Sequence, residues 1–210
     1  AYEKLQTLSK AQPDNIQIFI RMANIAFMME NYGAMATACE KAILLDSENA
    51  TAHYLYAEAC KGQGDDVNTI AMATKAISID NKQGNAYLLR GETYLRTQQL
   101  SEAEADADWL LEHTEDNEDV LLLKARIERA VNRNNESIEY FTKAIDANPF
   151  SYTAFKERSE MYSLVGNEAK AKEDAERAEE LMPTDGKENA EENIEKQLND
   201  KYKQMNPYGF

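Results

Sequence analysis

The stretch Lys41-Ala42-Ile43-Leu44-Leu45-Asp46 returns 34 residues later as Lys75-Ala76-Ile77-Ser78-Ile79-Asp80. A third copy, Lys143-Ala144-Ile145-Asp146-Ala147-Asn148, lies two further periods along the chain. A fixed period of this length is typical of helical repeat arrays, in which each repeat contacts only its neighbours. The hexapeptide therefore predicts a repeat protein, and its period can be used to divide the rest of the chain into units.

Counted in both directions from Ala42, the period divides the chain without an insertion into units 16–49, 50–83, 84–117, 118–151 and 152–185. The eighth position of every unit is small, as two closely packed helices require. Its residues are Ala23, Ala57, Gly91, Ala125 and Ser159. Pro149 and Pro183 occupy position thirty-two of the last two units, where proline stops a helix. Each unit is therefore expected to be a hairpin of two helices.

This pattern resembles the tetratricopeptide repeat (TPR) family. The family signature has a bulky residue at position four, a small one at eight, an aromatic one at eleven, alanines at twenty and twenty-seven, and proline at thirty-two. Unit five matches it through Phe155, Ser159, Tyr162, Ala171, Ala178 and Pro183. Units one and four depart from it at position eleven, where Ala26 and Glu128 stand. The resemblance implies an all-α fold, an α-solenoid whose helix-turn-helix repeats form a right-handed superhelix.

Both ends of the chain extend beyond the five units. In residues 1–15, Tyr2, Leu5 and Leu8 form the apolar stripe of a second helix, so we expect a truncated repeat cut from a longer protein. Residues 186–210 contain a second apolar stripe, which would cover the last repeat. Its residues are Ala190, Ile194, Leu198, Tyr202 and Met205. A polar-backed helix of this kind is predicted to be a C-terminal cap, followed by a loose tail.

The chain is acidic, with 38 Asp and Glu against 23 Lys and Arg and a formal net charge of −15. Nucleic acids and anionic membranes bind basic surfaces, so neither is an expected partner. No stretch is long and apolar enough for membrane insertion. The two cysteines, Cys39 and Cys60, lie at apolar positions without the spacing of a zinc or redox pair. They favour the cytoplasm slightly and are compatible with export.

No arrangement of residues in the sequence indicates catalysis, a cofactor or a metal ion. His53 takes the bulky fourth position of its unit, so we expect it to pack in the core. The acidic run 102–108 falls inside a predicted helix and lacks the glycine of a calcium loop, which favours a solvated face. Trp109 stands where sister units carry lysine. It is either a contact on the outer surface or folded over its neighbours.

The resemblance implies that first helices line an inner groove through positions two, five, nine and twelve. The candidate groove residues are Ile20, Tyr54, Leu88, Leu122 and Lys156 at position five, Asn24, Glu58, Glu92 and Arg126 at position nine, and Phe27, Lys61, Leu95 and Arg129 at position twelve. This surface would bind an extended or helical peptide with apolar anchors, and an acidic group near the basic end at Arg126, Arg129 and Lys156. Alternatively, these side chains are partly buried between helices and no peptide binds there.

The leading functional prediction is a non-catalytic scaffold that binds a protein or peptide of unknown identity. Relatives that hold chaperone tails use a clamp of Lys, Asn and Arg in three successive units. Glu58 and Glu92 would repel such a carboxylate, so a chaperone-tail clamp is rejected. The alternatives are a structural module that self-associates end to end, or an accessory domain of a longer protein.

Overall fold

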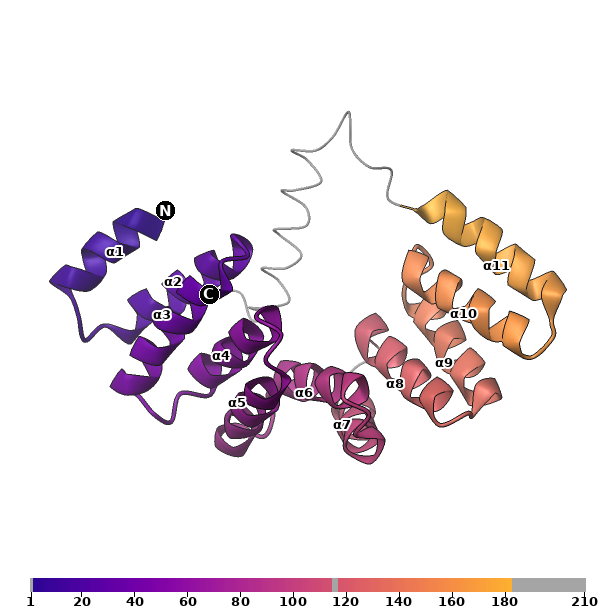
Figure 1. Ribbon diagram of the computed structural model, residues 1–210, viewed down its shortest axis with the longest axis horizontal. Coiled ribbons are helices and arrows are strands. Elements are labelled where there is room, and N and C mark those ends of the chain that lie inside the picture. Colours follow the sequence, from indigo (N-terminus) through magenta and orange to yellow (C-terminus); the bar gives the residue numbers. More distant parts are fainter. Residues whose placement is uncertain (1, 115–116, 183–210) are drawn as a thin grey trace.

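The computed structural model describes residues 2–114 and 117–182, and in them the chain forms eleven α-helices and no strand (Figure 1). The helices are α1 (Tyr2–Ala11), α2 (Ile16–Met28), α3 (Tyr32–Leu45), α4 (Ala50–Gly62), α5 (Asp66–Ile79), α6 (Gly84–Arg96), α7 (Leu100–His113), α8 (Glu118–Ala130), α9 (Asn134–Ala147), α10 (Tyr152–Leu164) and α11 (Glu168–Leu181). The predicted capping helix and tail in residues 186–210 lie outside the described residues.

The helices form hairpins, with α2 packed on α3 and the same pairing repeated through α10 and α11. Four of the five hairpins begin after a residue that caps the first helix. Asn15, Asn49, Asn117 and Ser151 each accept a hydrogen bond from a backbone N–H in the first turn. The first helices of the hairpins begin at residues 16, 50, 84, 118 and 152, one period apart.

In the turn of each hairpin, the residue at position fifteen has a left-handed backbone conformation. Gly64 and Gly166 have φ values of 75° and 78°, as glycine readily allows. Glu30, Gln98 and Asn132 take φ values of 53°, 62° and 63° at the equivalent places. Glycine occupies this position in two units, and the left-handed conformation recurs in all five.

The core is a strip between the two layers of helices. Position eight is buried at Ala23, Ala57, Gly91 and Ala125, where first and second helices approach closely. The buried residues fall into three clusters along the array, one within helices α2 to α6, one within α6 to α8 and one within α8 to α10. His53 is 6% exposed, so its expected packing role is confirmed.

Successive hairpins are joined by a repeated polar contact. The residue at position seven bonds to position twenty-five of the preceding unit. The pairs are Tyr56 with Glu40 at 3.1 Å, Arg90 with Thr74 at 3.0 Å, Lys124 with Asp108 at 2.6 Å and Arg158 with Thr142 at 3.0 Å. These contacts fix each first helix on the second helix of the hairpin before it.

The stacked hairpins curve into a crescent (Figure 1). At its middle, α4, α6 and α8 lie on the inside, and α5, α7 and α9 lie on the outside. Helix α4 contacts α6, and α6 contacts α8, so first helices form a continuous inner surface. This surface is where the groove residues were predicted to lie.

Candidate functional site

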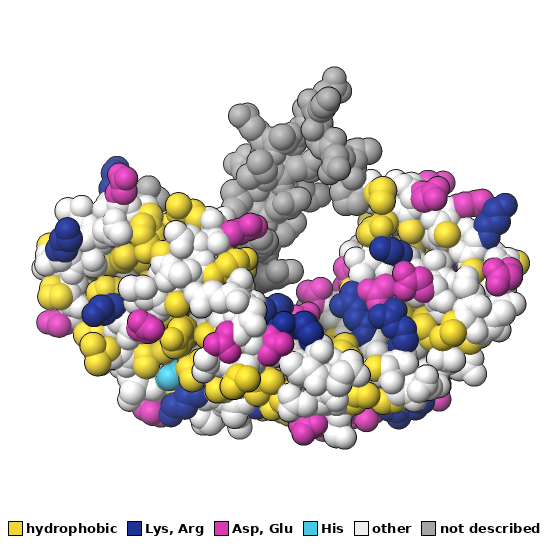
Figure 2. All heavy atoms as spheres, in the orientation of Figure 1, with side chains coloured by type: hydrophobic (Ala, Val, Ile, Leu, Met, Phe, Trp, Pro, Cys, Tyr) yellow, Lys and Arg dark blue, Asp and Glu magenta, His cyan; other side chains and the backbone are white. Residues whose placement is uncertain are grey.

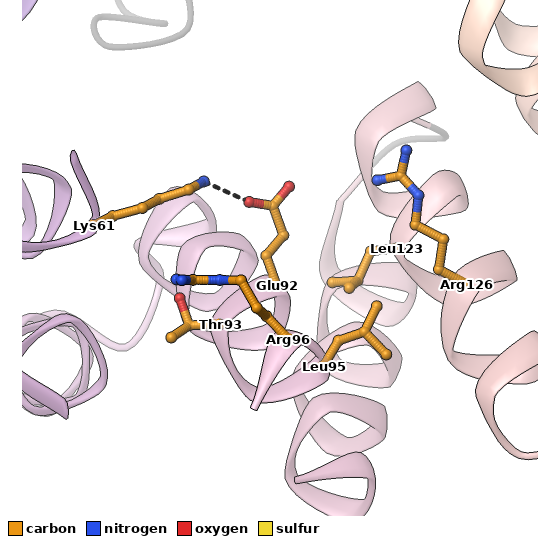
Figure 3. A pocket seen from close by; sticks show the side chains of 7 residues that line it. All are labelled: Lys61, Glu92, Thr93, Leu95, Arg96, Leu123 and Arg126. Carbon is orange, nitrogen blue, oxygen red and sulfur yellow. Dashed lines mark hydrogen bonds and ion pairs between the residues drawn. The ribbon is translucent and has the colours of Figure 1, made fainter. Parts of the chain in front are cut away.

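A cavity of about 300 Å³ opens at the middle of the inner surface, between α4, α6 and α8. It is lined by Lys61, Glu92, Thr93, Leu95, Arg96, Leu123 and Arg126 (Figure 3). Figure 2 shows charged side chains gathered around the hollowed middle of the crescent. We refer to these seven residues as the central cavity.

The central cavity brings together four of the predicted groove residues, Lys61, Glu92, Leu95 and Arg126. The other lining residues, Thr93, Arg96 and Leu123, were missed because only positions two, five, nine and twelve were considered. Arg96 lies four residues after Glu92, and Leu123 lies three residues before Arg126. Residues at these spacings share one face of a helix, so this signal was present in the sequence.

Ion pairs link neighbouring first helices along the inner surface. Lys61 Nζ lies 2.7 Å from Glu92 Oε2, and Arg129 Nη1 lies 3.4 Å from Glu160 Oε2. Both pairs join position twelve of one unit to position nine of the next. At the step between them, Leu95 and Arg126 occupy these two positions. The leucine interrupts the charged series, and it lines the cavity beside Leu123, which is almost fully buried.

The expected basic end of the groove is largely neutralised, which corrects the sequence-based prediction. Arg126 Nη2 lies 2.6 Å from Glu157 Oε1, and Arg129 Nη2 lies 3.5 Å from Glu157 Oε2. Glu157 is at position six of its unit, outside the positions considered. Lys156 remains exposed, with its Nζ 5.7 Å from the centre of the Tyr152 ring. An acidic ligand group is therefore not drawn to this end by free arginines.

The predicted apolar row is not an exposed floor. Tyr54 and Leu122 are only 7% and 5% exposed, because they pack between helices. Ile20 and Phe27 are partly buried against the core cluster of α2 to α6, and Leu88 against that of α6 to α8. The alternative of side chains partly buried between helices thus describes this row. Of the two leucines that line the cavity at the centre, Leu95 is partly exposed and Leu123 is only 1% exposed.

Carboxylates in a more enclosed setting lie beside the cavity. Burial raises the pKa of Glu58, although Lys61 and the hydrogen bond from Tyr54 Oη, at 2.8 Å, act to lower it. Burial also raises the pKa of Asp119, and the nearby Glu92 adds to this effect. These carboxylates lie near the cations of the cavity lining, since Glu58 acts on Lys61 and Asp119 acts on Arg126.

Asn24, the first predicted residue at position nine, lies in α2 away from the cavity. Its Oδ1 is buried and has no hydrogen-bond partner in the described residues. The candidates thus differ in setting: some line the central cavity, some are buried between helices, some form ion pairs along the inner surface, and Lys156 is exposed.

Trp109 folds over its neighbours. Its ring stacks on Tyr87 with centroids 3.8 Å apart and on His113 with centroids 4.5 Å apart. The side chain is half-buried in this three-ring stack, which resolves the two expectations in favour of packing.

Within residues 2–114 and 117–182, no group of three or more His, Cys, Asp or Glu residues is arranged to hold a metal ion. Among the same residues, no helix has both the length and the apolar character needed to cross a membrane.

Comparisons with known proteins place this geometry in context. The model of the tetratricopeptide repeat family matches residues 118–151. The crystal structure of YrrB, described as a TPR protein with an unusual peptide-binding site, is 19% identical with a TM-score of 0.68, over 88% of this chain and 95% of that one. A tetratricopeptide repeat protein from Parabacteroides merdae is 20% identical with a TM-score of 0.76, over 100% and 86% of the two chains.

A third solved structure, MamA from Desulfovibrio magneticus, is 13% identical with a TM-score of 0.72, over 79% of this chain and 94% of that chain. No curated protein sequence gives a match. The predicted α-solenoid fold is confirmed, since these solved structures share it, and the predicted resemblance to the tetratricopeptide repeat family is confirmed by the family model at residues 118–151. Stacked helical repeats of this kind form extended concave surfaces suited to protein interactions.

Proposed function

We propose that this protein is a non-catalytic scaffold that binds a peptide segment of a partner protein at the central cavity. The observation that carries the proposal is the cavity itself, since three successive first helices contribute to one concave site. Ligand sites are typically concave, with apolar lining and a few polar groups that set orientation. The partly exposed Leu95 supplies the apolar part, and Lys61, Glu92 and Arg126 supply charged groups around it.

The size of the cavity fits a side-chain anchor rather than a whole small-molecule ligand. Its volume of about 300 Å³ is at the lower end of ligand pockets. The inner surface continues on both sides along α2 and α10, so an extended segment could contact several units while one residue fills the cavity. The solved structure of YrrB, with its peptide-binding site, is consistent with such use of the fold.

The test is selection from a random dodecapeptide phage library on the purified protein. The strongest peptides are then synthesised with a fluorescent label, and their affinities are measured by fluorescence anisotropy. Leu95→Glu places a charge on the cavity floor and should weaken binding at least tenfold, because a desolvated apolar contact is replaced by a charge.

Leu44→Glu is the matched control, since Leu44 is 79% exposed on α3, a second helix. It should leave affinity unchanged. The proposal fails if no peptide binds, or if the two variants weaken binding equally. Circular dichroism verifies that both variants keep the helical fold. End-to-end self-association and a role as an accessory domain of a longer protein remain predictions.

A further inference from the structure

We infer that the outer face of α11 is the terminal face of the array, which no further helix covers, whether from this chain or from a second copy. It comprises positions twenty-one, twenty-four, twenty-five and twenty-eight of unit five, which are Lys172, Ala175, Glu176 and Glu179. Figure 1 shows α11 at one end of the crescent. The inference is independent of peptide binding at the central cavity.

In units one to four, the equivalent positions pack on the next hairpin. Position twenty-five bonds to position seven of the following unit in each case. Position twenty-four is fully buried at Cys39, Ala73, Ala107 and Phe141. In unit five the equivalent Ala175 is exposed. Burial at position twenty-four therefore reports whether another helix lies on this face of a second helix.

The chemistry of the face changes together with its exposure. Positions twenty-one, twenty-five and twenty-eight are Ile70, Thr74 and Ile77 in unit two, and Ile138, Thr142 and Ile145 in unit four. All four isoleucines are half-buried. In unit five the same positions carry three charged residues, and Lys172 and Glu176 form a solvated pair at 3.6 Å with side chains 79% and 65% exposed. A polar outer face of this kind is typical of the last repeat of an array.

Unit three shows what a charge on this face requires when a helix covers it. Its position twenty-one is Glu104, whose Oε1 lies 3.2 Å from Lys124 Nζ and 2.6 Å from Arg133 Nη2 of the following hairpin. Two cations from the next unit thus compensate one covered carboxylate. A helix that covered Glu176 and Glu179 would have to bring comparable cations, because a charge removed from water without a partner is unfavourable.

The sequence that follows α11 brings acids instead. If the period continued, Glu188 and Glu192 would take positions three and seven of a sixth unit. Position three is buried and apolar in all five units, where its residues are Ile18, Ala52, Ala86, Val120 and Ala154. Position seven makes the contact with position twenty-five, so Glu192 would lie next to Glu176. Both acids disfavour a sixth first helix, in contrast to the cap predicted from the apolar stripe of residues 186–210.

A terminal face at α11 sets the C-terminal limit of the concave surface. Helix α10 is then the last first helix that a bound partner contacts. Stacked repeats bury their apolar faces on each other, and α11 offers no such face to a further repeat. End-to-end association of two copies through this face is therefore disfavoured.

Thiol labelling of the full chain tests the inference, because it reports whether position twenty-four is covered. Ala175→Cys introduces a thiol on the terminal face, and Ala73→Cys introduces one at the equivalent, fully buried place of unit two. Unit one carries Cys39 at this position, so cysteine fits there. A maleimide should modify Ala175→Cys roughly 100-fold faster than Ala73→Cys, whose thiol reacts only after local opening.

The wild-type protein gives the background, since Cys39 and Cys60 are both buried. Rates are measured at low and at high protein concentration. Fast labelling of Ala175→Cys at both concentrations supports the terminal face. Labelling as slow as that of Ala73→Cys at both concentrations would overturn the inference in favour of cover by the same chain, and slow labelling only at high concentration would overturn it in favour of a second copy. If Ala73→Cys loses its helical circular dichroism, Cys39 of the wild-type protein is the slow reference.

Discussion

Arg90 and Arg158 occupy position seven of units three and five and make the same contacts. Arg90 Nε and Nη2 lie 2.8 and 2.7 Å from the Asp106 carboxylate, and Arg158 pairs with Asp174 at 2.7 and 2.8 Å. Two rings flank each guanidinium at 5.5 to 5.7 Å: Tyr87 and Tyr94, or Phe155 and Tyr162. Planar, bidentate geometry and ring contacts favour arginine over lysine at this position.

Arg90→Leu is expected to lower the free energy of unfolding by about 3 kcal/mol, since it leaves the buried Asp106 carboxylate without its partner. Asp106 is only 4% exposed, so water cannot replace the guanidinium. The double variant Arg90→Leu with Asp106→Leu should recover most of this loss, because the uncompensated charge is removed. Urea unfolding measures all three proteins. A double variant as unstable as the single one would contradict the explanation.

Glu58 gives the inner surface a pH-dependent contribution to stability. Burial raises its pKa, so the folded chain holds the proton more tightly than the unfolded chain does. Stability contributed by this group is therefore greatest at low pH and falls as pH rises through the folded pKa. Glu58→Gln removes the titration and retains an acceptor for Tyr54. The free energy of unfolding of this variant minus that of the wild-type protein should therefore be larger at pH 7 than at pH 4.

Urea unfolding at both pH values measures that difference. Glu112→Gln is the control, because the Glu112 side chain is 78% exposed. The explanation is wrong if Glu58→Gln shows the same difference from wild type at both pH values, or a reversed one.

At the scale of single elements, the left-handed residue of each turn decides how well the hairpin closes. Glycine adopts this conformation without the steric cost that a Cβ atom brings. Gly64 has no heavy atom within 4 Å of the place where a Cβ would lie, so only its φ of 75° disfavours a side chain. In units with glutamate, glutamine or asparagine at this position, that steric strain lowers the stability of the turn.

Gln98→Gly should therefore raise the free energy of unfolding by about 1 kcal/mol, and Gly64→Ala should lower it by about the same amount. The two changes act at equivalent positions of successive units, so each is the control for the other. Thermal and urea unfolding provide the measurement. Two changes of the same sign would show that contacts other than the backbone conformation dominate the turn.

At the scale of the whole molecule, stability is distributed along the array. Each hairpin packs mainly on its neighbours, and the core is divided into three clusters. Phe141 is fully buried at 0% exposure in the cluster formed by α8 to α10. Helices α2 to α4 contribute to a different cluster and have no residue in this one. A destabilising substitution in one hairpin should therefore affect neighbouring hairpins more than distant ones.

Phe141→Ala is expected to destabilise its region by about 3 to 5 kcal/mol, the usual cost of removing a buried ring. Amide hydrogen exchange followed by mass spectrometry should show faster exchange in α8 to α11 and nearly unchanged protection in α2 to α4. A uniform loss of protection in all helices would instead mean that the five hairpins unfold as one cooperative unit.

The sequence by itself determined the repeat and much of the fold. The return of Lys41–Asp46 after 34 residues gave the period, and the small residues at position eight marked the close approach of helices. These features act within one unit or between neighbours in the chain, where spacing along a helix fixes which side chains share a face. Hence Ala42, Ala76 and Ala144 could be placed in the core, where all three are fully buried.

Only the tertiary structure decided which candidate groove residues are paired, buried or at the cavity. The contacts of Lys61 with Glu92 and of Arg126 with Glu157 join residues 31 positions apart on different helices. They depend on the angle and distance between successive first helices, which the period does not specify. For the same reason, the sequence could not show that Glu157 neutralises the expected basic end or that Tyr54 and Leu122 are buried. It also could not show that Arg96 and Leu123 meet Lys61 at one cavity.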